Sequence, residues 1–325
     1  MNITPLCGRV YQAVEGFERY LKIELSSGSK IENFSISDNL SSATESTNHP
    51  LFYAENVSAP AFWTQNEWQE PFRFEFDSIN EAASTLHSIQ RNWTSTLFTQ
   101  FRRGSLIQSK LPAISSKPKT FPWLYPESPI GAWTLLDAHT IIASARCSSP
   151  FPGGLITFEE DKAGPPSRAY LKFQEALVRA RKWPLPNERC VDAGASPGGW
   201  SWVLARLGTE TTAIDRAPLN ERIMKMPGLH FIKHDAFTLK PEEIGPIDWL
   251  FSDVICYPPR LYDWIEKWLV SGLCKNFVCT IKMQGEADFE TTRRFAAIPG
   301  SMVLHLYHNK HELTWIKTES VGTEH

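Results

Sequence analysis

Four charged residues, three at the ends of predicted strands and one on a predicted helix, could together move a proton. In chain order they are Lys172, Asp253, Lys282 and Glu312. A lysine can take a proton from a weakly acidic hydroxyl only if burial or a neighbouring cation lowers its pKa. Lys172 beside Lys282 would act in that direction, whereas the two carboxylates would orient the ammonium and oppose the shift. Taken singly, each residue would more simply belong to a solvated surface ion pair.

A glycine-rich loop within Cys190–Trp200 follows an apolar strand that Asp192 closes. Three glycines remove side chains where a ligand would approach the backbone: Gly194, Gly198 and Gly199. Ser196 and Pro197 are expected as the N-cap and the first residue of a helix. The N–H groups of such a helix start favour a carboxylate or another anionic group. The glycine spacing does not fit the dinucleotide motif Gly-x-Gly-x-x-Gly, and a tight turn without function is the alternative.

The loop, Asp-x-Gly-x-x-Pro-Gly-Gly-Trp, resembles the cofactor loop of FtsJ-type methyltransferases, which use S-adenosyl-L-methionine (AdoMet) to methylate ribose. Ser-Arg-Ala-x-x-Lys, Ser-Asp, Ile-Lys and His-Glu-Leu-Thr place the four charged residues in the order of that family's Lys-Asp-Lys-Glu tetrad. The span from about Pro165 to Ile316 further resembles the RlmM-type large-subunit rRNA cytidine 2′-O-methyltransferases, for example in Pro258-Pro-Arg and Leu306-Tyr-His-x-Lys-His-Glu-Leu-Thr. Over residues 1–150 the resemblance is weak.

The resemblance implies a general-base mechanism. Lys282 would take the proton of a ribose 2′-hydroxyl as its oxygen attacks the methyl group. Asp253 and Lys172 would modulate and orient this lysine, and Glu312 would support them. Positioning the oxygen in line with the methyl group would supply much of the acceleration.

The resemblance also implies AdoMet as the cofactor. Asp215 ends a strand, where a carboxylate accepts hydrogen bonds from ribose hydroxyls, and Asp235 resembles the family's adenine-side acid. The alternative for Asp235 is an exposed turn residue. The expected cofactor-binding residues are Asp192, Gly194, Ser196, Pro197, Gly198, Gly199, Trp200, Asp215, Asp235 and Asp253.

Other methyl-transfer chemistries fit the sequence less well. Methylation of an exocyclic amine would need an Asp/Asn-Pro-Pro-aromatic strand end, but here the strand ends Asp253-Val-Ile-Cys and the two prolines come later. Carbon methylation through a cysteine would favour a Pro-Cys strand end, which is missing.

Composition indicates a globular protein. The 325 residues are 42% hydrophobic and 12% aromatic, which allows a sizeable core in two or three domains. No apolar run approaches the roughly 20 residues that cross a bilayer, and the N-terminus lacks a signal peptide. Six scattered cysteines without a Cys-x-x-Cys pair suggest reduced thiols, neither a disulfide framework nor a metal site. We therefore expect a cytoplasmic protein without a membrane partner.

Charge is segregated along the chain. The net charge of −3 argues against non-specific polyanion binding by the whole surface. From residue 91 to residue 126, however, all charged residues are basic: Arg91, Arg102, Arg103, Lys110, Lys117 and Lys119. Trp93, Phe98, Phe101 and Trp123 lie among or after them, which suits phosphate contacts and base stacking. A solvated face beside an apolar core is the alternative.

The N-terminal half is expected to be α/β (α+β). Helical spacing marks Val14–Leu25 and Ser78–Phe101, and strand patterns mark Ala61–Trp63 and Phe72–Phe76. Ser37–Asn48 is expected to be a loop, Thr134–Ala145 a strand pair, and Pro150–Pro166 the interdomain link. The region 1–58 is expected to be ferredoxin-like, and 59–155 a reduced THUMP-like RNA-binding region, as the resemblance implies.

Strands and helices alternate in the second half, which predicts a mostly parallel sheet. The expected elements are helix Ser167–Ala180, strand Arg189–Asp192, a helix from Gly198, and strands at Thr211–Asp215, Leu229–Lys233, Trp249–Asp253 and Phe277–Lys282. An antiparallel hairpin would follow at Met302–His308 and Glu312–Thr318. We expect residues 160–325 to form a Rossmann-like AdoMet methyltransferase domain.

The sequence thus favours an AdoMet-dependent RNA 2′-O-ribose methyltransferase, acting on large-subunit ribosomal RNA in a single-stranded or loop context and not on DNA. A catalytically silent RNA-binding protein on the same fold is one alternative. Methylation of another RNA or of a small-molecule hydroxyl is the other.

Overall fold

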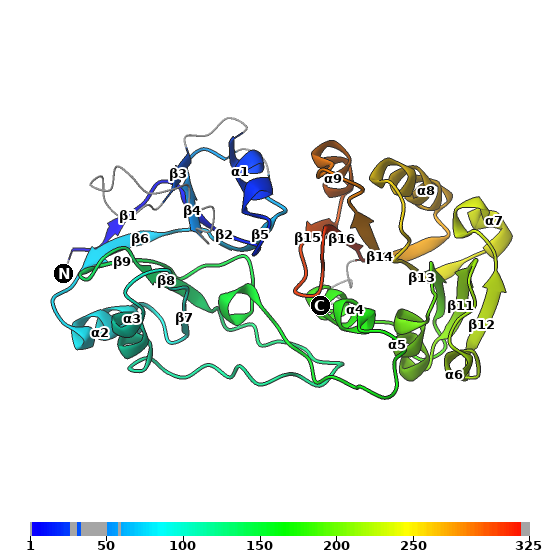
Figure 1. The fold of residues 1–325 in the computed structure, drawn as a ribbon, viewed down its shortest axis with the longest axis horizontal. Helices are drawn as coiled ribbons and strands as arrows, with labels where there is room; N and C mark the ends of the chain where they lie inside the picture. The colour runs from blue at the N-terminus through cyan, green and yellow to red at the C-terminus, as the bar shows by residue number, and fades with distance from the viewer. Residues whose placement is uncertain (1, 27–30, 34–50, 58–59, 320–325) are drawn as a thin grey trace, which may run out of the picture. The chain divides into compact units, whose positions relative to one another are not determined.

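A computed structural model describes residues 2–26, 31–33, 51–57 and 60–319, and the chain forms two compact units (Figure 1). The first unit comprises Met1–Pro118 and Tyr125–Thr157, and the second comprises Lys119–Leu124 and Phe158–His325. The chain therefore passes between the units three times. The loop expected at Ser37–Asn48 lies outside the described residues.

Two sheets form the first unit. The four-stranded sheet has the order β3 (Ile31–Asn33), β4 (Leu51–Ala54), β2 (Arg9–Ala13), β5 (Thr64–Trp68). The five-stranded sheet has the order β1 (Thr4–Pro5), β6 (Phe72–Glu75), β9 (Thr140–Ser144), β8 (Gly131–Leu135), β7 (Trp93–Ser95). The helices are α1 (Glu18–Ser26), α2 (Ile79–Ile89) and α3 (Phe101–Gln108), with a short 3-10 turn, η1 (Pro152–Gly154).

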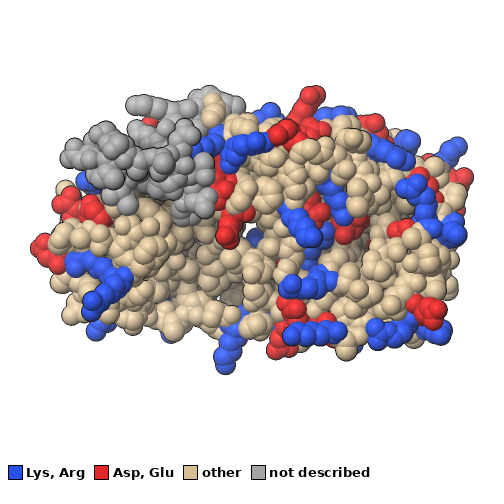
Figure 2. Space-filling view, viewed as in Figure 1, with Lys and Arg blue, Asp and Glu red and all other residues tan. Residues whose placement is uncertain are grey.

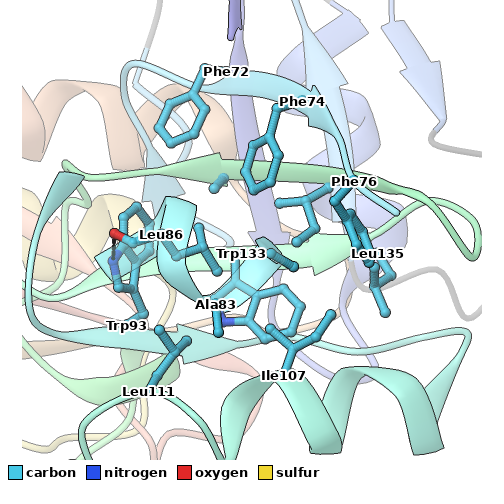
Figure 3. Close-up of a cluster of buried hydrophobic side chains, with 13 residues drawn as sticks. Phe72, Phe74, Phe76, Ala83, Leu86, Trp93, Ile107, Leu111, Trp133 and Leu135 are labelled. Carbon is cyan, nitrogen blue, oxygen red and sulfur yellow. Dashed lines mark hydrogen bonds between the residues drawn. The ribbon is translucent and has the colours of Figure 1, made fainter. Parts of the chain in front are cut away.

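The five-stranded sheet is buried on both faces because its central strands alternate large and small apolar residues. Trp133 and Ile141 pack with α2 and α3 residues such as Leu86 and Ile107 (Figure 3). Ala132 and Ile142 point the other way and pack against Trp68 and other residues of the four-stranded sheet. The period of two along a strand explains this division.

The expected regions 1–58 and 59–155 share strands. β5 of the later region pairs with β2, and β1 pairs with β6 of that region. The identification of these regions as ferredoxin-like and THUMP-like stays a prediction. Strand β6 (Phe72–Glu75) and the hairpin of β8 and β9 confirm the strands predicted for these two segments.

Three local predictions for the first unit need correction. The first helix begins only at Glu18, because Gly16 has a positive φ of 81°. Phe62 and Trp63 are not in a strand, since their backbone N–H groups donate to the carboxylate of Glu24. The helix that Ser78 caps ends at Ile89, where the chain becomes extended and enters β7.

The second unit is built on a seven-stranded sheet, with the order β12-β11-β10-β13-β14-β16-β15. The strands are β10 (Arg189–Ala193), β11 (Glu210–Asp215), β12 (Leu229–Lys233), β13 (Ile247–Ser252), β14 (Cys274–Lys282), β15 (Ser301–Leu304) and β16 (Glu312–Lys317). The first five are parallel, and β16 pairs antiparallel with both β14 and β15. The predicted Rossmann-like fold with a C-terminal antiparallel hairpin is confirmed.

Helices cover both faces of this sheet. They are α4 (Ala169–Arg179), α5 (Gly199–Leu207), α6 (Glu221–Met224), α7 (Pro241–Ile244), α8 (Pro258–Ser271) and α9 (Phe289–Ala296), with a 3-10 turn, η2 (Ala236–Thr238). The chain moves outward in one direction from β10 through α5 to β11, and in the other from β13 through α8 to β14. Right-handed crossovers therefore place α5 and α8 on opposite faces (Figure 1).

The strand order reverses between β10 and β13, which are parallel neighbours in the sheet. In open α/β sheets, ligands bind beyond the carboxyl ends of the strands at such a reversal. Asp253 and Gly194 directly follow these two strands, so this edge of the sheet is where a site is expected.

Within the described ranges, no helix is both long and apolar enough to cross a membrane. All six cysteines carry free thiols.

Candidate functional site

The four charged residues predicted from the sequence come together in one cluster. Lys172 Nζ lies 2.9 Å from Asp253 Oδ1 and 2.8 Å from Glu312 Oε1. Lys282 Nζ lies 3.0 Å from Asp253 Oδ1 and 3.9 Å from Glu312 Oε2. Positive and negative groups thus alternate around a ring. We call these four residues the charged tetrad.

The sheet determines where the tetrad forms. Asp253 follows β13, whose neighbour β14 ends in Lys282. Glu312 begins β16 and lies directly opposite Lys282 in the antiparallel register. Lys172 is on α4, which runs along one face of the sheet (Figure 1). Three adjacent strand ends and one helix therefore bring together residues that are up to 140 positions apart in the chain.

Charge pairing controls protonation inside the tetrad. Burial alone would raise the pKa of Asp253, but the ammonium groups of Lys172 and Lys282 outweigh it and hold that pKa below its ordinary value. Burial would lower the pKa of Lys172, but the carboxylates of Asp253 and Glu312 raise it. Asp253 is therefore held ionised and Lys172 is held as a cation at neutral pH.

A cavity of about 310 Å³ opens beside the tetrad at the carboxyl ends of the parallel strands. Its lining includes the following residues predicted for the cofactor or for catalysis: Gly194, Ser196, Asp215, Asp235, Asp253 and Lys282. Lys172 and Glu312 are not part of the lining. Of the two tetrad lysines, only Lys282 therefore faces the space that a ligand would fill.

The glycines of the loop allow close packing around the cavity. Gly194 has a positive φ of 78°, and a Cβ atom there would lie 3.1 Å from the backbone of Val254. Gly198 has a φ of 110°, and a Cβ atom would lie 2.9 Å from the Ile223 side chain. Non-glycine residues rarely adopt this backbone region, so both positions require glycine.

The prediction that Ser196 caps the helix is wrong. Gly198 is the N-cap, and its left-handed conformation means that Pro197 precedes the helix as well. The backbone N–H of Ser196 donates to Asp215 Oδ2 at 3.0 Å, and its hydroxyl donates to the Pro218 carbonyl. Ser196 instead ties the loop to the end of β11.

Several other predicted cofactor residues do not line the cavity: Asp192, Pro197, Gly198, Gly199 and Trp200. Asp192 is buried and accepts a hydrogen bond of 2.6 Å from the Ser201 hydroxyl. Burial raises its pKa to about 7. Trp200 stacks on Phe173, and its Nε1 donates to the Ala169 carbonyl. Their role as direct cofactor contacts stays a prediction, and in the structure they support the loop.

The two remaining predicted acids, Asp215 and Asp235, both line the cavity. Asp215 accepts backbone N–H groups from both Ser196 and Ala217, which fixes its carboxylate. Asp235 accepts from the Phe237 N–H at 3.1 Å and is partly buried, so it is not simply an exposed turn residue.

Sequence reasoning missed several residues that line the cavity: Ile214, Arg216, His234, Ala236, Phe237, Val254, Ile255 and Arg260. Six of them lie one to four residues after a predicted strand end, which was the available signal. Arg260 lies in the Pro258-Pro-Arg motif, but no role could be assigned to it from its position in the sequence.

The predicted basic residues are divided between the two units. Arg91, Arg102, Arg103, Lys110 and Lys117 belong to the first unit, and Lys119 belongs to the second. Arg102 is exposed, whereas Arg103 is partly buried over the Phe76 ring. On the face shown in Figure 2, basic and acidic side chains intermingle without a large area of one sign. RNA binding by these residues stays a prediction.

Among the aromatic residues near these cations, Trp93 is not available for stacking. It is fully buried, and its Nε1 donates to the Leu86 carbonyl (Figure 3). Phe101, by contrast, is 61% exposed at the start of α3.

The second unit has a Rossmann-like sheet, and its cavity lies where such folds bind their ligands. Residues 165–318 match the family of FtsJ-like methyltransferases. This match covers slightly less than half of the chain and assigns AdoMet as its cofactor.

Curated relatives share the name ribosomal RNA large subunit methyltransferase M. The protein of Azoarcus sp. (strain BH72) is 31% identical over 52% of this chain and 50% of its own length. That of Pseudomonas putida is 35% identical over 47% of this chain and 44% of its own length. That of Xanthomonas oryzae pv. oryzae (strain PXO99A) is 27% identical over 72% and 68%. The match to the Azoarcus protein thus spans about half of that relative's length.

The residues of the cavity fit AdoMet. Carboxylates can accept hydrogen bonds from ribose hydroxyls and an ammonium group, and three of them line it: Asp215, Asp235 and Asp253. Apolar side chains on the same wall, including Ile214, Phe237 and Ile255, can cover the faces of an adenine ring.

Proposed function

We propose that this protein transfers the methyl group of AdoMet to a ribose 2′-hydroxyl of RNA, with large-subunit ribosomal RNA as the substrate and the cytoplasm as its location. The charged tetrad carries this proposal, because it places one partly accessible lysine at the cavity beside a buried, permanently charged one. The names of the relatives supply the RNA class.

Lys282 is the proposed general base. AdoMet supplies, when bound, a methyl group on a positively charged sulfur. With AdoMet bound, neutral Lys282 Nζ would accept the proton of the 2′-hydroxyl while that oxygen bonds to the methyl carbon and the bond from this carbon to sulfur breaks. Asp253 and Glu312 hold Nζ in place on one side, which leaves its remaining direction for the hydroxyl.

Lys172 is a positioning residue in this proposal. Its side chain is 7% exposed, and it contacts both carboxylates of the tetrad. The positive charge of Lys172 balances the negative charge of one carboxylate. Lys282 therefore does not have to neutralise both acids.

The first unit is proposed to position RNA through its basic residues and the exposed Phe101. Phosphate contacts by Arg and Lys and stacking on an aromatic ring are the usual means by which single-stranded RNA is bound.

The full-length protein should be incubated with AdoMet carrying an isotopic label in the methyl group and with unmodified large-subunit ribosomal RNA transcribed in vitro. Digestion to nucleosides and mass spectrometry should then give one labelled 2′-O-methyl nucleoside. A labelled base, or RNA binding without any methyl transfer, would contradict the proposal. The second outcome would favour a silent RNA-binding protein.

A further inference from the structure

Two strongly exposed side chains, one aliphatic and one aromatic, lie close together in the chain beside the cavity. They lie on the segment Val254–Arg260, which directly follows Asp253 and which we call the acceptor rim. Ile255 is 73% exposed and lines the cavity, and Tyr257 is 67% exposed and lies outside the lining. Exposed apolar surface at the edge of a groove is typical of a ligand-binding site.

Arg260 gives the same segment a positive charge. It lies in the first turn of α8, and its side chain is 57% exposed. The guanidinium lies 4.7 Å from the centre of the Phe237 ring, and 3.6 Å from Asp235 Oδ2. A long, solvent-exposed ion pair of this kind is weak. Arg260 is therefore held in place by the ring but keeps donors for another anion.

The acceptor rim and the proposed base face the same space. Arg260 and Lys282 both line the cavity. Cys256, between Tyr257 and Ile255 in the chain, lies within electrostatic range of both cations: burial raises its pKa to about 11, while Arg260 and Lys282 act to lower it. A nucleotide that presents its ribose to Lys282 would therefore bring a neighbouring phosphate and base close to this segment.

We propose that the acceptor rim grips the RNA nucleotide next to the methylated ribose, with Tyr257 stacking on its base and Arg260 binding its phosphate. This inference rests on the proposed function. An aromatic ring can stack on the base of a single-stranded nucleotide, and a neighbouring guanidinium can bind its phosphate. AdoMet does not explain the exposed Tyr257, because that side chain lies outside the cavity that the cofactor would fill.

The test uses the full-length variants Tyr257→Ala, Tyr257→Phe and Arg260→Ala. We expect Tyr257→Ala to raise the KM for unmodified large-subunit ribosomal RNA by about 5- to 100-fold, the range for loss of one base–aromatic stack. Tyr257→Phe should stay near wild type because the ring is kept. Arg260→Ala should raise the same KM. It should also reduce the number of counterions released on RNA binding, measured from the salt dependence of the affinity, by about one. The Kd of AdoMet, measured by calorimetry, should stay near wild type in the two Tyr257 variants, whose side chain lies outside the cavity lining. Because Arg260 lines the cavity, the KM of Arg260→Ala for RNA is measured at saturating AdoMet.

Arg294→Ala is the matched control. Arg294 also lies over an aromatic ring, at 3.9 Å from the centre of Tyr262, but it is not part of the cavity lining. It should leave the KM for RNA unchanged. An unchanged KM in Tyr257→Ala and Arg260→Ala would overturn the inference. So would a parallel loss of AdoMet affinity in Tyr257→Ala, which would assign the segment to the cofactor.

The inference and the proposed function can fail separately. If the wild-type protein forms no 2′-O-methyl nucleoside, the proposed function fails. The affinity of the same variants for the ribosomal RNA, measured without turnover, then decides on the acceptor rim: a loss supports it and wild-type affinity overturns it.

Discussion

Lys172 and Lys282 approach the same oxygen atom, Oδ1 of Asp253, at 2.9 Å and 3.0 Å. The two lysines are nevertheless in different surroundings. The side chain of Lys172 is 7% exposed and that of Lys282 is 18% exposed, and only Lys282 lines the cavity. Similar contacts to one carboxylate can therefore serve stability at one lysine and chemistry at the other.

Replacing Lys282 should abolish most of the methyl transfer. Lys282→Met removes the proposed base and should lower kcat by about 100-fold or more, the usual contribution of general-base catalysis. The Kd of AdoMet should change little. Methyl transfer to unmodified ribosomal RNA and calorimetry of AdoMet binding measure the two effects.

Lys275→Met provides the control on the same strand. Lys275 is exposed and forms an ion pair with Asp248, far along the strand from the charged tetrad. It should keep wild-type kcat. A Lys282→Met variant that retains activity would remove the general-base assignment.

Replacing Lys172 should affect stability first. Lys172→Met leaves two buried carboxylates with only Lys282 as a partner, so we expect the free energy of unfolding to fall by about 3 kcal/mol or more. Urea denaturation measures this loss. The smaller burial of Lys282 predicts a smaller loss for Lys282→Met. Equal stability of Lys172→Met and wild type would show that the tetrad is not a buried charge network.

Asp192 should make stability depend on pH in an unusual direction. Burial raises its folded-state pKa from 3.8 to about 7, so the folded protein keeps a proton that the unfolded chain has lost between these values. The contribution of Asp192 is therefore present below about pH 4 and is lost as the pH rises to about 7, by about 4 kcal/mol in total.

The variant Asp192→Asn should lack this loss. Its asparagine oxygen can still accept the Ser201 hydroxyl. The free energy of unfolding of the variant, relative to wild type, should rise between pH 4.5 and pH 7.5 in urea titrations. Parallel curves for the two proteins would show that Asp192 is already ionised across this range.

Gly194 should control cofactor affinity through the shape of the loop. Gly194→Ala adds a methyl group at a positive φ of 78° and against Val254, so the loop must move. We expect the Kd of AdoMet to rise about tenfold or more, with a loss of about 1–3 kcal/mol of stability from backbone strain.

Gly208→Ala separates strain from contact. Gly208 ends α5 with nearly the same φ, 79°, but its nearest neighbour would be Pro186 at 3.6 Å, which is ordinary contact. It should lose stability but keep AdoMet affinity. Similar losses of affinity in both variants would mean that strain alone weakens the site.

The sequence predicted the second unit well because its strands are short apolar runs separated by amphipathic helices. Polar residues at the ends of such strands must meet at one sheet edge, which is why Asp253 and Lys282 could be placed from the sequence alone. Lys172 and Glu312 could be added only through the resemblance to a family, because nothing in their own neighbourhoods distinguishes them from surface charges.

The failures have local physical causes. Phe62 and Trp63 have the composition of a strand, but a distant carboxylate on Glu24 binds their N–H groups. Trp93 sits in a basic, polar stretch, yet it fills the core between two helices and a sheet. Arg260 is an ordinary surface arginine in the sequence and becomes relevant only because α8 starts beside the cavity. Each case depends on contacts between residues far apart in the chain.

The short segment Lys119–Leu124 belongs to the second unit although first-unit residues flank it on both sides. Its Lys119 carbonyl accepts from the Glu159 N–H at 3.0 Å, and its Phe121 ring packs on Phe158 and Trp183. A gene fusion or deletion with a single breakpoint therefore cannot separate the two units intact. For the same reason, one crossover between genes cannot replace either unit whole by a foreign module.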